Sequence, residues 1–383
     1  MTTLVISDLH LGARTGIDVL RRRELREPLL RSLADAERVV ILGDLLELRH
    51  GPAREALGAA RPFLEELGEA VGDREVVVVP GNHDHQLVAP WLERRGSEAP
   101  GAPLRAEERI AARDASPLAA RLAQWAAPAR LEVAYPGVWL RDDVYATHGH
   151  YLDRHTTLPA YERIGAALVE RFVAPLPDPL ATPDDYEAIF APIYALLHGA
   201  AQYVPESAGA AHNGASVRLW DGVRGDTRRR RRARYAMLAL GVPLAIAALN
   251  RVGLGPLNPD LSGRALRRAS LEAMSEVVAR LGIVARYVVF GHTHRAGPFA
   301  GDDPADWTTS TGARLVNSGN WTYEPAFLTD APNESPYWPG VCVAVEDADT
   351  PPELRRLLGY RTHADLSGPL PGPQGSPGVK HVA

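Results

Sequence analysis

The sequence predicts an α/β fold, in which strands and helices alternate along the chain. Short runs rich in Val and Ile recur and end in polar residues, and helix-like stretches lie between the first of them, at Val19–Ala36 and Ala53–Val71. The runs are continuously apolar rather than alternating, as expected for strands that are covered on both faces. Strand–helix–strand repetition of this kind is typical of α/β folds.

The composition fits one large or two smaller soluble domains: the chain has 383 residues, 45% of them hydrophobic and 23% charged. A net charge of -5 gives no overall preference for nucleic acid or anionic membranes, so any basic surface must be local. The single cysteine, Cys342, excludes an internal disulfide and a cysteine-rich metal site. No signal-peptide pattern precedes the first apolar run, which predicts a cytoplasmic protein.

Five of the apolar runs end in side chains that can bind metal ions. Their ends carry, in chain order, Asp8, Asp44, Asn82, His148 and His292. In α/β folds, ligands bind beyond the carboxyl ends of the strands, so we expect these side chains to meet at one site. Apolar runs at 314–316 and 341–345 predict two further strands.

The candidate metal ligands are seven side chains in these turns: Asp8, His10, Asp44, Asn82, His148, His292 and His294. Carboxylate, amide and imidazole donors suit Mn²⁺, with Fe or Zn²⁺ as alternatives. Seven ligands are too many for one ion in ordinary geometry, whereas two ions can share the carboxylate of Asp44. His150, two residues after His148, is an alternative metal ligand or a substrate contact.

These motifs resemble the calcineurin-like metallophosphoesterase superfamily, whose pattern is Asp-x-His, Gly-Asp, Gly-Asn-His-Asp/Glu, His and Gly-His-x-His. Every element is present, within residues 1–150 and about 284–346. The resemblance implies a four-layer αββα sandwich, which contains a two-layer β-sandwich and a dinuclear centre. It assigns one ion to Asp8, His10, Asp44 and His294, and the other to Asp44, Asn82, His148 and His292.

The resemblance also implies that His83 is a catalytic histidine that does not bind metal. Its place next to Asn82 makes it a candidate general acid for the leaving group. Two cations about 3.5–4 Å apart would lower the pKa of a bridging water and neutralise charge on the phosphate. Asp84 either orients the His83 ring or caps the loop through backbone contacts. Candidate substrate contacts, with surface roles as the alternative, are Arg14, Arg295 and Asn317.

Residues 151–280 interrupt the motif pattern and are mostly helical in character. We predict a helical insertion there, which caps a core formed by residues 1–150 and 281–365, and a disordered tail over 366–383. Within the insertion, the arginine cluster Arg228–Arg234 precedes the apolar run Tyr235–Leu249, which is too short to span a bilayer comfortably. The two features predict either peripheral membrane contact or a helix pair packed on the core.

The expected function is hydrolysis of phosphate esters with two divalent metal ions. The sequences of Ser7–Gly12 and Gly43–Glu47 are similar to those of the UDP-2,3-diacylglucosamine pyrophosphatase branch, whose members cleave a lipid-linked nucleotide. That branch often has Gly-Asn-Arg-Asp where this chain has Gly-Asn-His-Asp. We therefore do not assign the lipid substrate of that branch to this chain. The similarity still favours a phosphodiesterase or pyrophosphatase acting on a nucleotide- or lipid-linked substrate. A metal-dependent nuclease is disfavoured by the acidic net charge, and a non-catalytic scaffold by the complete ligand set.

Overall fold

The computed structural model describes residues 2–98, 101–172, 175–204, 243–260, 262–328 and 334–368. The arginine cluster Arg228–Arg234 lies outside these residues, as do the first part of the apolar run after it and residues 369–383 of the predicted tail. Within the described ranges, no helix is both long enough and apolar enough to cross a membrane.

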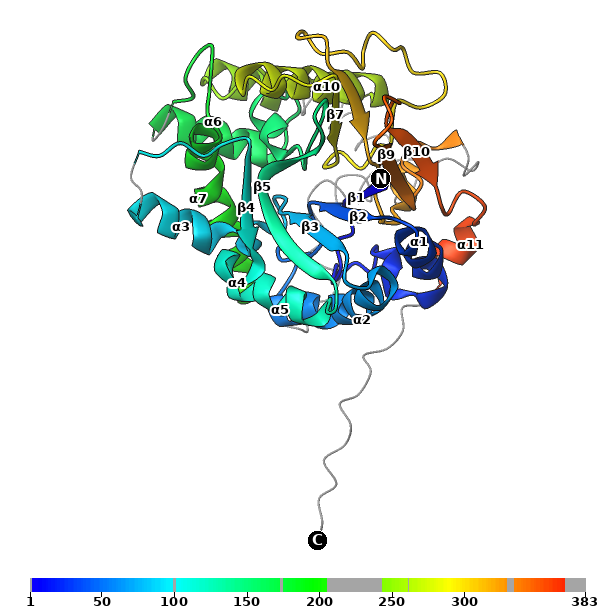
Figure 1. Ribbon diagram of the computed structural model, residues 1–383. Coiled ribbons are helices and arrows are strands. Elements are labelled where there is room, and N and C mark those ends of the chain that lie inside the picture. Colours follow the sequence, from blue (N-terminus) through cyan, green and yellow to red (C-terminus); the bar gives the residue numbers. More distant parts are fainter. Residues whose placement is uncertain are drawn as a thin grey trace.

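The described strands form one continuous ten-stranded sheet that folds back on itself (Figure 1), in the order β10-β9-β1-β2-β3-β5-β6-β7-β8 with β4 added beside β5. One half contains β1 (Thr2–Ile6), β2 (Arg38–Leu42), β3 (Glu75–Val79), β4 (Glu107–Ala111), β9 (Val341–Glu346) and β10 (Glu353–Arg356). The other half contains β6 (Val144–Thr147), β7 (Tyr287–Phe290) and β8 (Arg314–Asn317). Pairing is parallel among β1, β2 and β3, and again among β6, β7 and β8.

Strand β5 (Arg130–Arg141) joins the two halves and is the long curved strand of Figure 1. Its first residues pair in parallel with β3, whereas Gly137–Arg141 pair antiparallel with β6. The apolar pattern does not predict this strand, because Pro136 and Gly137 interrupt it and both residues are unfavourable inside a strand. The strand tolerates them at the point where its pairing partner changes.

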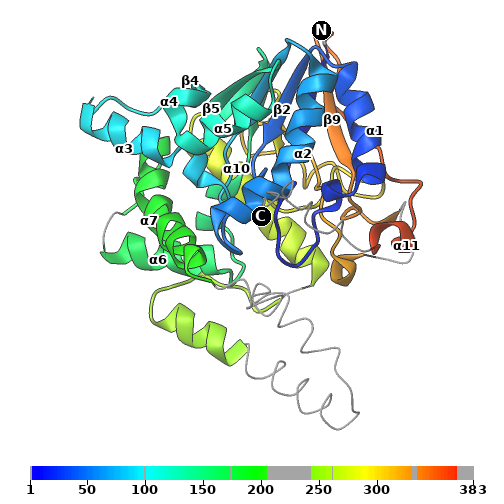
Figure 2. The ribbon, with the colours of Figure 1, turned by 90° about the horizontal axis from the view of Figure 1, so that it is seen from below.

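Helices cover both outer faces of the folded sheet, which confirms the predicted αββα sandwich (Figures 1 and 2). Helices α1 (Arg23–Ala34), α2 (Ala53–Val71) and α5 (Pro117–Trp125) bury their apolar faces against the first half. Helix α10 (Gly263–Arg280) packs on the second half. A third apolar layer, rich in valine, lies between the two halves. In β1, Leu4 and Ile6 face the helices and Val5 faces the inner layer, so the strand is apolar throughout.

The two predicted N-terminal helices are both present, one of them in two pieces. Helix α2 begins and ends at the predicted residues, and Gly72 with a φ of 66° terminates it. The predicted helix Val19–Ala36 is divided into the 3-10 turn η1 (Val19–Arg21) and α1, because the backbone of Arg22 is extended between them.

The chain between β6 and β7 is largely helical in its described parts. It contains η3 (His150–Arg154), α6 (Tyr161–Phe172), α7 (Pro183–Gln202) and α10. Helix α10 falls within the range assigned to the insertion, yet it forms an outer layer of the sandwich. The remaining short elements are η2 (His85–Leu87), α3 (Ala89–Glu98), α4 (Ala112–Ala115), η5 (Pro325–Phe327) and α11 (His363–Leu366).

Candidate metal centre

The predicted ligands converge where β1, β2, β3, β6 and β7 end. Two groups of side chains bring one donor atom each within 4.8 Å of one another: Asp8 with His10 and His294, and Asp44 with His148 and His292. A third group of this kind joins His10, Asp44 and His83. The strand ends therefore meet at one site, as parallel strands with aligned carboxyl ends require.

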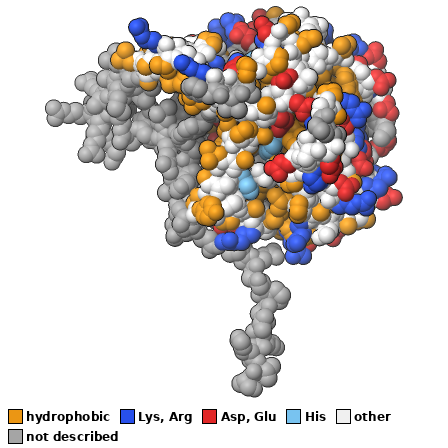
Figure 3. All heavy atoms as spheres, turned by 90° about the vertical axis from the view of Figure 1, so that its left-hand side faces the viewer, with side chains coloured by type: hydrophobic (Ala, Val, Ile, Leu, Met, Phe, Trp, Pro, Cys, Tyr) orange, Lys and Arg blue, Asp and Glu red, His pale blue; other side chains and the backbone are white. Residues whose placement is uncertain are grey.

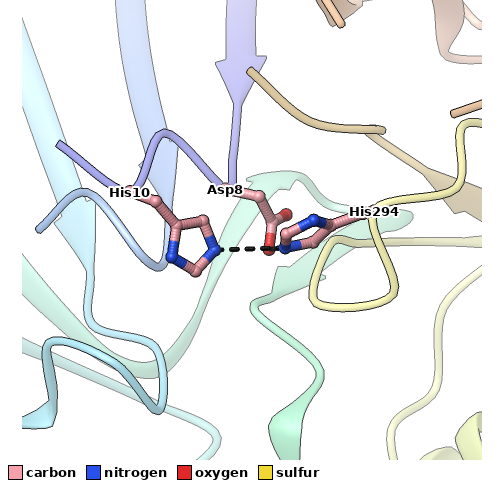
Figure 4. Close-up of side chains that lie close together, drawn as sticks. All are labelled: Asp8, His10 and His294. Carbon is pink, nitrogen blue, oxygen red and sulfur yellow. Dashed lines mark hydrogen bonds and ion pairs between the residues drawn. The ribbon is translucent and has the colours of Figure 1, made fainter. Parts of the chain in front are cut away.

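The first group lies between the loops that follow β1 and β7 (Figure 4). His10 Nε2 is 3.1 Å from His294 Nε2, and His294 Nε2 is 3.3 Å from Asp8 Oδ1. Asp44 Oδ2 adds a fourth donor, 3.5 Å from His10 Nε2. These are the four side chains predicted to hold one ion.

The second group shares Asp44 with the first. His148 Nε2 is 3.3 Å from Asp44 Oδ2 and 3.1 Å from Asn82 Oδ1. The ring of His292 lies edge-on to that of His148, with 5.2 Å between the ring centroids. Because one Asp44 oxygen faces both groups, this carboxylate can bridge two ions.

Neighbouring acceptors fix which nitrogen each histidine turns towards the site. Nδ1 of His148 contacts the carbonyl of Leu42 at 2.9 Å, and Nδ1 of His10 contacts Glu47 at 3.0 Å, which leaves Nε2 of both rings for the site. His292 is reversed: its Nε2 contacts Asp153 at 3.0 Å, and its buried Nδ1 has no hydrogen-bond partner. A second contact of this type is what orients metal-binding histidines in proteins.

The backbone of the site is strained at five predicted ligands. Positive φ angles of 45° to 65° occur at Asp8, His10, Asp44, His292 and His294, and these are the only described non-glycine residues in that region. Left-handed backbone is costly for residues with a Cβ, so the surrounding structure must hold it in place. The strain turns each side chain out of its strand and into the shared site.

The glycines of the motifs make room for the ligands. A Cβ added at Gly43 would lie 2.1 Å from Nδ1 of His148, and one added at Gly81 would lie 2.3 Å from Oδ1 of Asp44. Any larger residue at either position would therefore displace a ligand side chain. This contact explains why Gly precedes Asp44 and Asn82 in the motifs.

The buried charges of the site compensate one another. Burial lowers the pKa of His148, but Asp44, with Asp8 and the Leu42 carbonyl, outweighs burial and raises that pKa to about 9. Burial likewise lowers the pKa of His294, but Asp8 and Glu324 together raise it to about 10. Burial raises the pKa of Asp44, but His148 and His83 hold it well below its usual range. The site therefore favours bound positive charge, which protons supply when no cation is present.

These residues fit a pair of divalent cations. The donors are carboxylate, amide and imidazole atoms, a set that suits first-row divalent metals. Their separations of 3.1 to 3.5 Å agree with ligands that sit about 2.1 Å from a common ion. The buried Nδ1 of His292, which has no hydrogen-bond partner, would be satisfied by a bond to such an ion.

His83 lies beside this centre and is partly open to solvent, with 22% of its side chain exposed. Its Nδ1 is 2.8 Å from Glu47 Oε2, and its ring stands edge-on to that of His10 at 4.6 Å. Burial lowers the pKa of His83, while the carboxylates of Glu47 and Asp44 oppose that shift. Glu47 therefore holds the ring with Nε2 free to face a substrate.

The suggested role of Asp84 in orienting His83 is wrong. The carboxylate of Asp84 accepts hydrogen bonds from the backbone amides of Leu45, Leu46 and Gly81 at 2.7 to 3.2 Å, so it caps the loops instead. Burial and the Asp44 carboxylate raise the pKa of Asp84 to about 6. Asp84 fixes the two turns that carry Asp44 and Asn82, and Glu47 supplies the contact to His83.

His150 lies outside the groups that can hold a metal. It is buried, its Nε2 is 3.4 Å from the hydroxyl of Tyr135, and its Nδ1 has no hydrogen-bond partner. Burial lowers its pKa well below the usual histidine range. The structure thus brings His148, and not His150, into the metal groups.

The three remaining candidate substrate contacts are occupied by protein partners. Arg14 forms a two-point pair with Glu55, and Arg295 forms one with Asp302. Asn317 is fully buried and donates from Nδ2 to the carbonyl of Gly291 and the hydroxyl of Thr293. A substrate contact is therefore wrong for Asn317, which instead shapes the turn that carries His292 and His294.

Four residues of the site were missed from the sequence. Three carboxylates contact the ring nitrogens that face away from the metal site: Glu47 contacts Nδ1 of His10, and Asp153 contacts Nε2 of His292. Glu324 lies 3.6 Å from Nδ1 of His294. Arg49 pairs with Glu162 of α6 at 2.8 Å, and its buried Nε and Nη2 have no hydrogen-bond partner. The placement of Glu47 three residues after Asp44 was the one available signal, since the other contacts join distant parts of the chain.

Comparison with protein families agrees with this arrangement. A family model described as calcineurin-like phosphoesterase matches residues 1–296. A cold-active protein-tyrosine phosphatase from a psychrophile, Shewanella sp., is 13% identical with a TM-score of 0.26, over 92% of this chain and 80% of that chain. Another structure of a cold-active protein tyrosine phosphatase is 12% identical with a TM-score of 0.28, over 92% and 78%. Likeness at this level supports no inference about substrate. No protein of curated function matches the chain.

Proposed function

Because the chain belongs to the calcineurin-like phosphoesterase family, a family of metal-dependent phosphoester hydrolases, we propose that it cleaves a phosphodiester or pyrophosphate bond with two bound Mn²⁺ ions. The observation that carries the proposal is the shared carboxylate. One Asp44 oxygen lies within 3.3 to 3.5 Å of a histidine from each group, so both ions would act on the same phosphate.

When bound, the two ions would activate water and neutralise charge on the phosphate. The ligands for one would be Asp8, His10, Asp44 and His294, and those for the other Asp44, Asn82, His148 and His292. The protein's own task is to hold these donors rigidly, which the contacts to Leu42, Glu47 and Asp153 accomplish. Rigid donors stabilise the transition state without reorganisation during the reaction.

His83 would deliver a proton to the leaving oxygen from Nε2. Glu47 accepts from Nδ1 and so keeps a proton on that nitrogen, and its negative charge supports the protonated ring. The exposed fraction of 22% gives the ring access to a bound substrate. Asp44 accepts from the backbone amide of His83 at 2.8 Å, which ties the acid to the bridging carboxylate.

An extended substrate is favoured by the space beside the centre. A cavity of about 340 Å³ opens from His292 and His294 and runs between η3, α10 and the loop after β7. This volume accommodates a further group on the phosphorus: a phosphodiester carries a second organic group and a pyrophosphate a second phosphoryl group, neither of which a phosphomonoester has. The nucleotide- or lipid-linked nature of that substituent remains part of the proposal.

A substrate screen tests this function. The Mn²⁺-loaded protein is assayed against phosphomonoesters, phosphodiesters, cyclic nucleotides, nucleotide-linked pyrophosphates and DNA, with an Asp44→Asn variant as control. We expect hydrolysis of a diester or pyrophosphate that disappears in the variant. Absence of hydrolysis for every compound, or equal turnover by the variant, would overturn the proposal.

A further inference from the structure

We propose that the cavity beside the metal centre binds an uncharged aromatic group of the substrate, so that the preferred substrate is a phosphodiester with an aryl substituent. The inference rests on the proposed function, because it names the group attached to the phosphorus. It also selects between the two bond types proposed above, since it disfavours a second phosphate in the cavity.

The wall of the cavity is mostly apolar. Buried side chains of Leu152, Leu271, Phe290 and Trp307 line it, and Tyr337 adds a further ring. Figure 3 shows histidine side chains that reach the surface among hydrophobic side chains on one face of the molecule. Rings prefer edge-to-face or offset contacts with other rings, which Phe290, Trp307 and Tyr337 can provide.

The two arginines in the wall are already paired with carboxylates. Arg295 donates to both oxygens of Asp302, at 2.7 and 2.9 Å, and its guanidinium lies 5.6 Å from the Trp307 ring centre. Arg267 donates to the same Asp302 at 3.0 Å and to Asp306 at 3.4 Å. Each arginine of the described lining therefore has a carboxylate partner.

The acidic groups in the wall repel a second anion. Asp153 contacts His292 and Glu324 contacts His294, so both carboxylates lie where the cavity joins the metal centre. A pyrophosphate or carboxylate group entering the cavity would meet these charges, and neither arginine of the described lining is left without a carboxylate partner to pair with it. An uncharged ring would meet neither penalty and would gain from the apolar wall.

Binding of phosphonates that cannot be hydrolysed tests the inference. Calorimetry on the Mn²⁺-loaded protein compares naphthyl-, phenyl-, methyl- and 4-carboxyphenylphosphonate. All four carry the phosphonate group, and only the last carries a second anionic group on its substituent. We expect the naphthyl compound to bind at least about tenfold more tightly than the methyl compound, with a negative heat-capacity change. The carboxyphenyl compound should bind no more tightly than the methyl compound, because repulsion of its carboxylate offsets the gain from its ring.

Three variants locate the effect. Ser270 lies on α10 in the cavity wall, so Ser270→Phe should fill the cavity and abolish the naphthyl advantage while methylphosphonate binding stays unchanged. Ser275→Phe, on the same helix but outside this cavity, is the matched control and should retain the advantage. Asp302→Asn should release the two arginines and strengthen binding of the carboxyphenyl compound several-fold.

Equal binding of naphthyl- and methylphosphonate, or tightest binding of the carboxyphenyl compound by the unaltered protein, would overturn the inference. These outcomes are separable from failure of the proposed function. If the protein hydrolyses diesters but shows no preference for a ring, the cavity assignment alone is wrong. If no ester is hydrolysed and no phosphonate binds, the proposed function fails as well.

Discussion

At the scale of single residues, the chemistry depends on which atom each histidine presents. The carbonyl of Leu42 and the carboxylates of Glu47 and Asp153 select that atom for three of the rings. Glu47 does this twice, because it contacts both His10 and His83. One buried carboxylate thus couples the position of a metal ligand to that of the proposed acid.

Replacing His83 by alanine should separate proton transfer from metal binding. Because His83 contributes no donor to the two predicted ligand sets, His83→Ala should retain both ions, measured by elemental analysis. Turnover of substrates with poor leaving groups should fall by roughly 10²–10⁴-fold, with a smaller loss for good leaving groups. Full activity of the variant on poor leaving groups would rule out the acid role.

Metal loading should release protons at neutral pH. The pKa values of about 9 for His148 and about 10 for His294 mean that both rings are protonated at pH 7 when no ion is bound. Calorimetry in buffers of different ionisation enthalpy should therefore show release of about two protons per chain. Loading without proton release would contradict this.

The same pKa values predict the pH dependence of stability without metal. Both values are raised above the unfolded value of about 6.5. The two charged rings therefore stabilise the folded state fully below about pH 6.5. This stabilisation should be lost as the pH rises through about 9 to 10. Thermal melts of the metal-free protein across this range would record the loss.

Residue type and local pattern were sufficient to predict the seven candidate ligands, because each lies in a short motif at a strand end. The partners of those ligands were not predictable in the same way. Asp153 and His292 are 139 residues apart, and no local pattern relates them. Asn317 lies close to a motif turn, which suggested a contact to substrate. Its side-chain amide instead donates hydrogen bonds to Gly291 and Thr293 of the neighbouring turn.

At the scale of secondary structure elements, the strand-end turns create the site. Their positive φ angles and close-packed glycines aim side chains that a regular strand would point elsewhere. The sequence predicted the strands that these turns follow, since each is a short apolar run. It did not predict β5, whose apolar pattern is broken by Pro136 and Gly137, nor the amphipathic edge strands β4 and β10.

A methyl group at Gly81 should damage the metal centre. The new Cβ would lie 2.3 Å from Asp44 Oδ1 and 2.8 Å from the Asp44 backbone nitrogen, so the bridging carboxylate must move. We expect Gly81→Ala to weaken metal binding by roughly 10- to 100-fold, the effect typical of disturbed ligand support. Gly58→Ala in α2 is the matched control, because a Cβ there meets nothing within 4 Å. Unchanged metal affinity of Gly81→Ala would contradict the packing argument.

At the scale of the whole molecule, a buried polar cluster joins α7 to the sandwich. Glu187 of α7 accepts hydrogen bonds from the hydroxyls of Tyr135 in β5 and Tyr151 in η3, at 2.5 and 2.6 Å. Its other oxygen is 2.9 Å from Nε2 of His85, which follows the metal-centre loop. The helix beside the site is thereby attached to both halves of the folded sheet.

Glu187→Gln should loosen this attachment. Loss of the buried charge leaves His85 and the tyrosine hydroxyls with poorer partners, at a cost of about 3 kcal/mol. The melting temperature should fall by roughly 4 °C, measured by calorimetry. Glu276→Gln on the exposed face of α10 is the control, because its pair with Arg280 is partly solvated and should contribute little. Equal melting temperatures for the two variants would show that the cluster does not stabilise the fold.

One carboxylate, Asp44, is positioned to hold two ions together. Electron paramagnetic resonance of the Mn²⁺-loaded protein tests it directly, because two ions about 3.5–4 Å apart are magnetically coupled. We predict two Mn²⁺ per chain with a coupled spectrum, and loss of the coupling in Asp44→Ala. A single bound ion, or two ions with uncoupled spectra in the unaltered protein, would contradict the account.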